Sequence, residues 1–95
     1  MASYAADTAF HGALAPLTVD QVTLKGATGS RVKIINRDTS LPIYYRFDGV
    51  DPTVGGNESY IVSAGAIDSF SPLALPVEVR LISSGAAVYT VSSMA

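Results

Sequence analysis

Apolar and polar residues alternate along most of this chain in short runs that turn-forming residues separate. The clearest run spans residues 42–48, where Ile43, Tyr45 and Phe47 share one parity and more polar residues occupy the other. Successive side chains of a β-strand point to opposite faces, so this run predicts a strand whose apolar face belongs to a core.

Six further runs have the same character, and Gly, Pro, Ser or Asn residues bound them. We expect strands at residues 17–24, 30–36, 42–48, 58–63, 66–71, 76–83 and 86–93. In the first run the apolar parity changes between Val19 and Val22, which predicts a bulge near Asp20 and Gln21. Seven short strands without a helical period after residue 16 predict an all-β fold, a small β-sandwich or a short barrel.

Residues 1–16 differ from this pattern because they are rich in Ala, carry little charge and have no long apolar period. We interpret them as an extended N-terminal arm that precedes a domain of residues 17–95. On this interpretation the domain folds when residues 2–16 are deleted. The alternative is a disordered tail. The apolar side chains that would hold the arm on a partner are Tyr4, Phe10 and Leu14.

The composition of the 95-residue chain, 48% hydrophobic and 15% charged, is that of one globular domain. The absence of cysteine excludes disulfides and thiolate metal sites. The chain has neither a signal-peptide pattern nor an apolar run long enough to span a membrane. We therefore expect a complete short gene product that is made in the cytoplasm and binds no membrane. A net charge of −2 argues against a nucleic-acid partner.

Candidate chemistry is sparse, and we expect no enzyme activity, no cofactor and no metal. The only histidine, His11, lies outside the strand pattern, and no Gly-x-Ser-x-Gly motif is present. The acidic residues Asp48, Asp51 and Glu58 are the serious candidates for a Ca²⁺ site. Their spacing is unlike that of an EF-hand loop, and Asp beside Gly or Pro commonly shapes turns, so we interpret them as turn residues.

Tyr44 is expected on the outward face of the 42–48 strand, beside Arg46. Tyr and Arg are enriched among the residues that dominate interfaces, so these two side chains, with Asp51 from the following loop, are candidate partner-binding residues. The alternative is that Tyr44 covers a second sheet or lies beneath the N-terminal arm.

The segment from Ile43 to Asn57, followed by Tyr60-Ile61-Val62, resembles a pattern in small structural proteins of tailed bacteriophages. The run from Val79 to Tyr89 resembles their C-terminal hairpin, and the resemblance covers roughly residues 31–91. It implies a β-sandwich on the virion, as a head decoration (cement) or minor capsid protein made in the host bacterial cytoplasm. Such proteins commonly form trimers on the capsid surface, bind the major capsid protein and grip the shell with a terminal arm.

A second resemblance concerns residues 45–53, which are similar to the Tyr-x-x-Asp-Gly-x-Asp-Pro-Thr signature of immunoglobulin-like accessory modules in chitobiase-type glycosidases. Both resemblances imply an Ig-like sandwich, and in the second the Asp-Gly-x-Asp-Pro piece is a structural turn. They differ on function, which the fold alone does not decide.

We therefore expect a capsid decoration or minor capsid protein that stabilises the shell by bridging neighbouring capsid subunits. One alternative is a module that binds carbohydrate or a host surface through the 48–57 loop and Tyr44, although the chain lacks tryptophan. Another is a tail or connector protein with the same fold.

Overall fold

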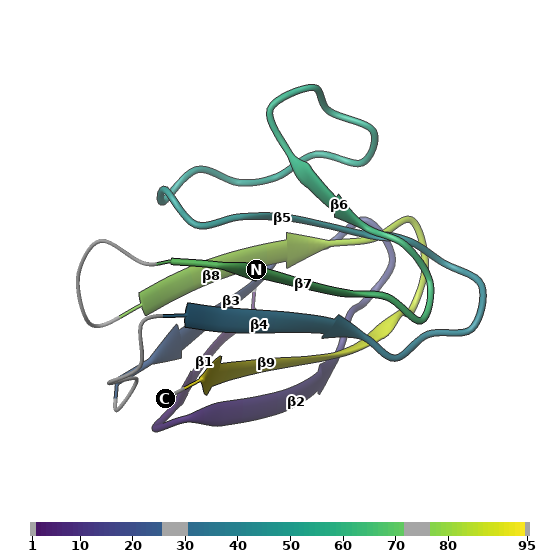
Figure 1. Cartoon of the computed structure of the whole chain (residues 1–95). Helices are drawn as coiled ribbons and strands as arrows, with labels where there is room; N and C mark the ends of the chain where they lie inside the picture. Colours follow the sequence, from purple (N-terminus) through teal and green to yellow (C-terminus); the bar gives the residue numbers. More distant parts are fainter. Residues whose placement is uncertain (1, 26–30, 72–76, 95) are drawn as a thin grey trace.

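The computed structural model describes residues 2–25, 31–71 and 77–94. Nine β-strands in these residues form two sheets that face each other (Figure 1). The five-stranded sheet has the order β1-β3-β8-β5-β6, and the four-stranded sheet has the order β2-β9-β4-β7. The strands are β1 (Ala2–Ala6), β2 (Ala9–Ala13), β3 (Asp20–Leu24), β4 (Arg31–Asn36), β5 (Ile43–Arg46), β6 (Tyr60–Val62), β7 (Ile67–Phe70), β8 (Val77–Ile82) and β9 (Val88–Met94).

The strand pairing from β2 to β9 is nested. Strand β2 pairs with β9, β3 with β8, β4 with β7 and β5 with β6, and every one of these pairs is antiparallel. The chain is thus one long hairpin wound into two layers, which is the jelly-roll arrangement, or double-stranded β-helix. The expected all-β sandwich is confirmed, but its strand order differs from that of the immunoglobulin-like domain that we expected.

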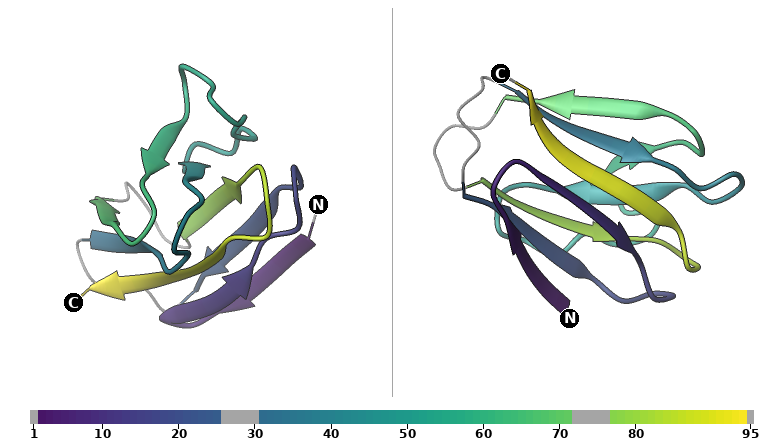
Figure 2. Two further views of the ribbon diagram at one scale, coloured as in Figure 1. Left: turned by 90° about the vertical axis from the view of Figure 1, so that its right-hand side faces the viewer. Right: turned by 90° about the horizontal axis from the view of Figure 1, so that it is seen from below.

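The N-terminal segment is part of both sheets, which corrects the expectation of a separate arm. Strand β1 pairs in parallel with β3, and β2 pairs with the C-terminal strand β9. Figure 2 shows these two strands at one end of the layers and β6, with the loop before it, at the other. The sequence pattern missed β1 and β2 because they are edge strands that present few apolar side chains to the core.

The residues proposed as arm contacts lie against their own domain, although Tyr4 remains 38% exposed. Leu14 is only 2% exposed and belongs to the core. The ring of Tyr4 stacks on that of Phe10 with centroids 4.6 Å apart, and Phe10 in turn lies against Tyr89. These contacts close the end of the sandwich at which β1 and β2 lie.

The seven predicted strands are present as β3 to β9, most of them shorter than predicted. The predicted bulge near Asp20 is absent, because the first of these strands begins only at Asp20. Leu17 lies before it with a positive φ of 54° and a 68% exposed side chain. Residues 30 and 76, the expected first residues of two strands, lie outside the described residues.

The core follows the alternation that the sequence predicted. Ile43 and Tyr45 of β5 are buried, and Phe47 is partly buried at the end of the same face. Four polar residues of the described part are buried, and each has a side-chain hydrogen-bond partner: Asp20, Asn36, Ser83 and Thr90. The Asn36 amide donates to the carbonyls of Leu41 and Val62, and the hydroxyl of Tyr89 donates to Asp20 at 2.9 Å.

Candidate functional site

The outer face of the five-stranded sheet, the one turned away from the four-stranded sheet, presents a row of apolar side chains. Tyr44 of β5 lies directly opposite Ile61 of β6 and Ile82 of β8. Opposite residues of neighbouring strands share a face and contact each other. Ile61 is 54% exposed, whereas Ile82 is almost fully buried and supports Tyr44 from the other side. We call these three residues the apolar row.

A row of charged side chains runs beside the apolar row. Arg46 of β5 lies directly opposite Arg80 of β8. Two like charges in this position repel each other unless anions lie beside them. Arg46 forms a two-bond ion pair with Asp48, and its guanidinium lowers the pKa of that carboxyl to about 2. Arg80 binds Asp51 at 2.7 Å and Glu78 at 2.8 Å. The two arginines are thereby held in fixed positions on the outer face.

The structure thus brings together the candidate residues Tyr44, Arg46 and Asp51, although they come from a strand and the loop after it. Arg46 lies two residues from Tyr44 on the same face, and Asp51 reaches this face through Arg80. The N-terminal segment does not lie over Tyr44, since β1 is three positions away from β5 in the strand order. Tyr4, Phe10 and Leu14 are not part of this face.

Sequence reasoning did not single out Arg80 or Ile61 as neighbours of Tyr44. Arg80 carried a signal, because it was on the outward parity of its strand, whereas Ile61 lies in the continuous apolar run of residues 60–62. Ile61 and Arg80 lie 17 and 36 residues after Tyr44 in the sequence, so their proximity to it depends on long-range strand pairing, for which the sequence has no local signal.

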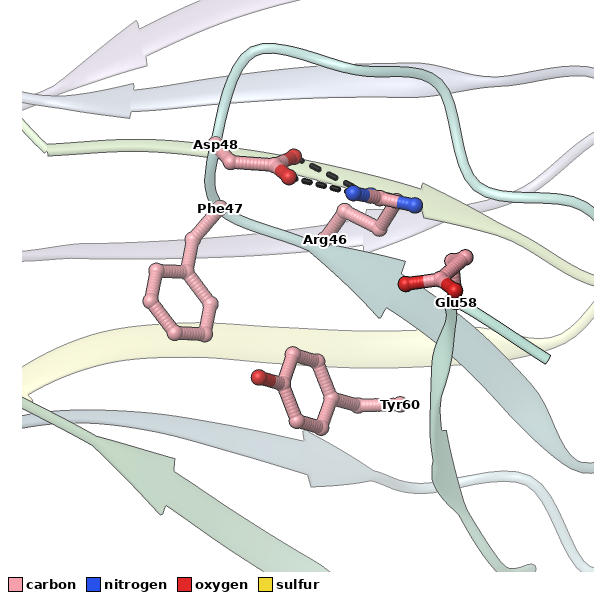
Figure 3. A pocket seen from close by; sticks show the side chains of 5 residues that line it. All are labelled: Arg46, Phe47, Asp48, Glu58 and Tyr60. Atoms are coloured by element: carbon pink, nitrogen blue, oxygen red, sulfur yellow. Dashed lines mark hydrogen bonds and ion pairs between the residues drawn. The ribbon is translucent and has the colours of Figure 1, made fainter.

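A pocket of about 240 Å³ opens where β5 ends, next to these rows. Its lining consists of Arg46, Phe47, Asp48, Glu58 and Tyr60 (Figure 3). The rings of Phe47 and Tyr60 lie together on one side, with centroids 5.6 Å apart and planes inclined by 18°. The guanidinium of Arg46 lies on the other side, between the carboxyl groups of Asp48 and Glu58 (Figure 3).

The aromatic side of the pocket is supported from within the sandwich. Phe47 stacks on Phe70 of β7 with centroids 4.0 Å apart, and Tyr60 stacks on Tyr45 at 5.3 Å. Tyr45 is fixed by a hydrogen bond from its hydroxyl to Asp68 at 2.8 Å. Burial, together with this carboxylate, raises the pKa of Tyr45. Since the supporting rings are packed between strands of both sheets, the shape of the pocket is held by the fold.

The described part of the chain holds no cluster of metal-ligating side chains. No three His, Asp or Glu side chains of residues 2–25, 31–71 and 77–94 are placed to hold a metal ion. His11 lies on the outer face of the other sheet, where its Nδ1 is 2.7 Å from the Thr90 hydroxyl. The same residues include no helix that is long and apolar enough to cross a membrane.

Comparisons with known proteins bear on the fold alone. No protein-family model matches the sequence, and no curated protein matches it either. Among known structures, the chain is similar to a de novo designed double-stranded β-helix determined by solution NMR, with a TM-score of 0.60 and 17% sequence identity. The match covers 88% of this chain and 95% of the designed one. It agrees with the nested strand order of β2 to β9 and identifies the fold as a small double-stranded β-helix.

Proposed function

We propose that this protein is a structural subunit of a bacteriophage virion, a capsid decoration (cement) or minor capsid protein, without catalytic activity. In this proposal it binds the major capsid protein through the outer face of the five-stranded sheet. The observation that carries the proposal is the apolar row of Tyr44, Ile61 and Ile82 beside the ion-paired Arg46 and Arg80.

This combination has the anatomy of a protein interface. Interfaces have an aromatic or aliphatic centre with a polar rim, and Tyr and Arg are enriched among the residues that dominate their energy. Ile61, opposite Tyr44, exposes 54% of its surface. Burying such a side chain in an interface contributes about 1–2 kcal/mol, or roughly a five- to thirtyfold gain in affinity.

The fixed arginines favour rigid docking. Each guanidinium is held by carboxylates of its own chain, so little side-chain entropy is lost when a partner covers it. The resemblance of residues 43–57 and 79–89 to phage structural proteins indicates the class of partner. A protein that binds only the assembled shell shifts the assembly equilibrium towards it, which is how a small rigid domain stabilises a capsid.

The contact with the shell is now assigned to a sheet face instead of an arm, because residues 2–13 are committed to β1 and β2. The proposal includes self-association, and a trimer is favoured. A closed ring of subunits around a symmetry axis of the capsid would place the outer face of each subunit on the shell. Light scattering coupled to size exclusion measures the oligomeric state.

The experiment is co-sedimentation of the purified protein with undecorated phage heads and, in parallel, with isolated tails. We expect saturable binding to heads alone, at a fixed ratio per capsid subunit. Binding to tails alone would replace the capsid role with the tail or connector role. A folded protein that binds neither would refute the virion proposal.

Two isoleucine variants give a matched comparison in the same assay. Ile61→Ser changes the apolar row, whereas Ile67→Ser changes an equally exposed isoleucine on β7 of the other sheet, 61% exposed. We expect Ile61→Ser to weaken head binding about five- to thirtyfold, and Ile67→Ser to bind like the parent protein. Equal effects of the two variants would remove the outer face as the docking surface.

A further inference from the structure

We propose that the pocket at the end of β5 binds one neutral sugar ring, as a monosaccharide or as a single unit of a longer glycan. The inference does not depend on the proposed capsid role, since it rests on the residues that line the pocket and on their charges.

One wall of the pocket is a stacking surface. Tyr60 is 52% exposed, yet its ring is held nearly parallel to that of Phe47 and packed on the buried Tyr45. The face of an aromatic ring carries partial negative charge and attracts weakly positive C–H groups. A pyranose ring presents such C–H groups on one face and hydroxyl groups around its rim.

The opposite wall supplies both donors and acceptors. Arg46 uses its Nε and one terminal nitrogen for Asp48, which leaves further N–H donors of the guanidinium free. Glu58 forms no hydrogen bond or ion pair with another of the described residues, so its carboxylate remains an acceptor at the pocket. Neighbouring hydroxyl groups of a sugar need donors and acceptors side by side, which this wall provides.

The charges of the pocket disfavour an anionic ligand. An anion would meet the carboxylates of Asp48 and Glu58, which outnumber the single guanidinium of Arg46 (Figure 3). Because that guanidinium is already paired with Asp48, it offsets little of the repulsion between the carboxylates and an anion. A neutral polyhydroxylated ligand contacts all three groups without this repulsion.

The size of the pocket limits the ligand to one ring. Its volume of about 240 Å³ is below the roughly 300–1,000 Å³ of pockets that enclose drug-sized molecules. Two of the lining residues border solvent. Tyr60 exposes 52% of its surface, and the side chain of Asp48 exposes 50%. The remainder of a glycan therefore has room to extend away from the protein.

The test is an NMR titration of the ¹⁵N-labelled full chain with methyl glycosides of glucose, galactose and N-acetylglucosamine. Choline and glucuronate serve as charged comparators. We expect at least one glycoside to shift the amides of residues 46–48 and 58–60 at up to about 50 mM, where a ligand with a Kd of about 10 mM fills most sites. Glucuronate should shift these amides less.

Variants locate the binding in the pocket. Tyr60→Ala removes the stacking surface and should weaken binding about tenfold, and Glu58→Gln removes the charged acceptor and should weaken it about fivefold. Tyr4→Ala, an aromatic truncation on β1 at the opposite edge of the five-stranded sheet and outside the pocket lining, is the matched control and should change the Kd less than about twofold. A dispersed amide spectrum shows that each variant is folded.

Three results would overturn the inference: no glycoside shifts the pocket amides, a charged probe binds more tightly than every glycoside, or both pocket variants bind like the parent protein. None of these results affects head binding by the parent protein, and a failure of head binding leaves the titration unchanged. The two proposals therefore fail separately.

Discussion

The buried hydrogen bond between Tyr89 and Asp20 gives the sharpest test of how this fold is stabilised. The Tyr89 hydroxyl donates to the Asp20 carboxyl at 2.9 Å, and the two residues are 0% and 3% exposed. This bond joins β9 of one sheet to β3 of the other. Among the described residues, the Asp20 side chain forms no other hydrogen bond. The substitution Tyr89→Phe therefore leaves a buried carboxyl group without its donor.

The cost of this substitution follows from the burial of both groups. Removing one partner of a buried bond to a charged group costs about 2–3 kcal/mol, whereas a bond between neutral groups contributes about 1 kcal/mol. We therefore expect Tyr89→Phe to lose about 2–3 kcal/mol of unfolding free energy at neutral pH. For a domain of this length, that loss lowers Tm by roughly 10–20 °C.

The loss should depend on pH because burial raises the pKa of Asp20 above its ordinary value, while the Tyr89 hydroxyl partly opposes this rise. A raised carboxyl pKa contributes stability that is fully present below the unfolded-state pKa and is lost as pH rises through the folded-state pKa. Removing the hydroxyl raises the folded-state pKa further. The penalty of Tyr89→Phe should therefore be larger near pH 7 than near pH 3, where it falls to about 1 kcal/mol.

The assay is urea unfolding followed by circular dichroism, with variant and parent protein compared at each pH so that other titrating groups cancel. Tyr44→Phe is the matched control, because its hydroxyl forms no hydrogen bond among the described residues, and it should stay within about 0.5 kcal/mol of the parent protein. A loss below about 0.5 kcal/mol for Tyr89→Phe at pH 7, or an equal loss at both pH values, would refute the reasoning.

Two further predictions concern the N-terminal strands. Deletion of residues 2–13 removes an edge strand from each sheet and uncovers the core beside Tyr89. The cooperative thermal transition should therefore be lost. A transition near that of the full chain would restore the arm interpretation. At Gly12 a Cβ atom would lie 2.6 Å from the ring of the buried Tyr89, so Gly12→Val should destabilise the protein by about 1–3 kcal/mol. The exposed neighbour Ala13→Val should change the unfolding free energy by less than about 0.5 kcal/mol in the same urea titration, and equal effects would contradict the packing argument.

Part of this fold could be predicted from the sequence because it depends on local alternation. The period of two in residues 42–48 and 76–83 identified strands and their buried faces, and the structure confirms those faces at Ile43, Tyr45 and Leu81. The outward position of Tyr44 and Arg46 followed from the same parity. Alternation is a property of each strand alone, so it needs no knowledge of partners.

The tertiary structure alone decided the partners of each strand. Residues 2–13 have too few apolar positions to predict strands, and they become β1 and β2 only because the edges of β3 and β9 offer unpaired backbone groups. The same holds for the sites. Arg80 meets Asp51 across 29 positions, and Glu58 and Tyr60 meet Phe47 only because β6 returns beside β5. The side-chain pattern determined which residues face inward, and long-range backbone pairing determined which of the others meet on the surface.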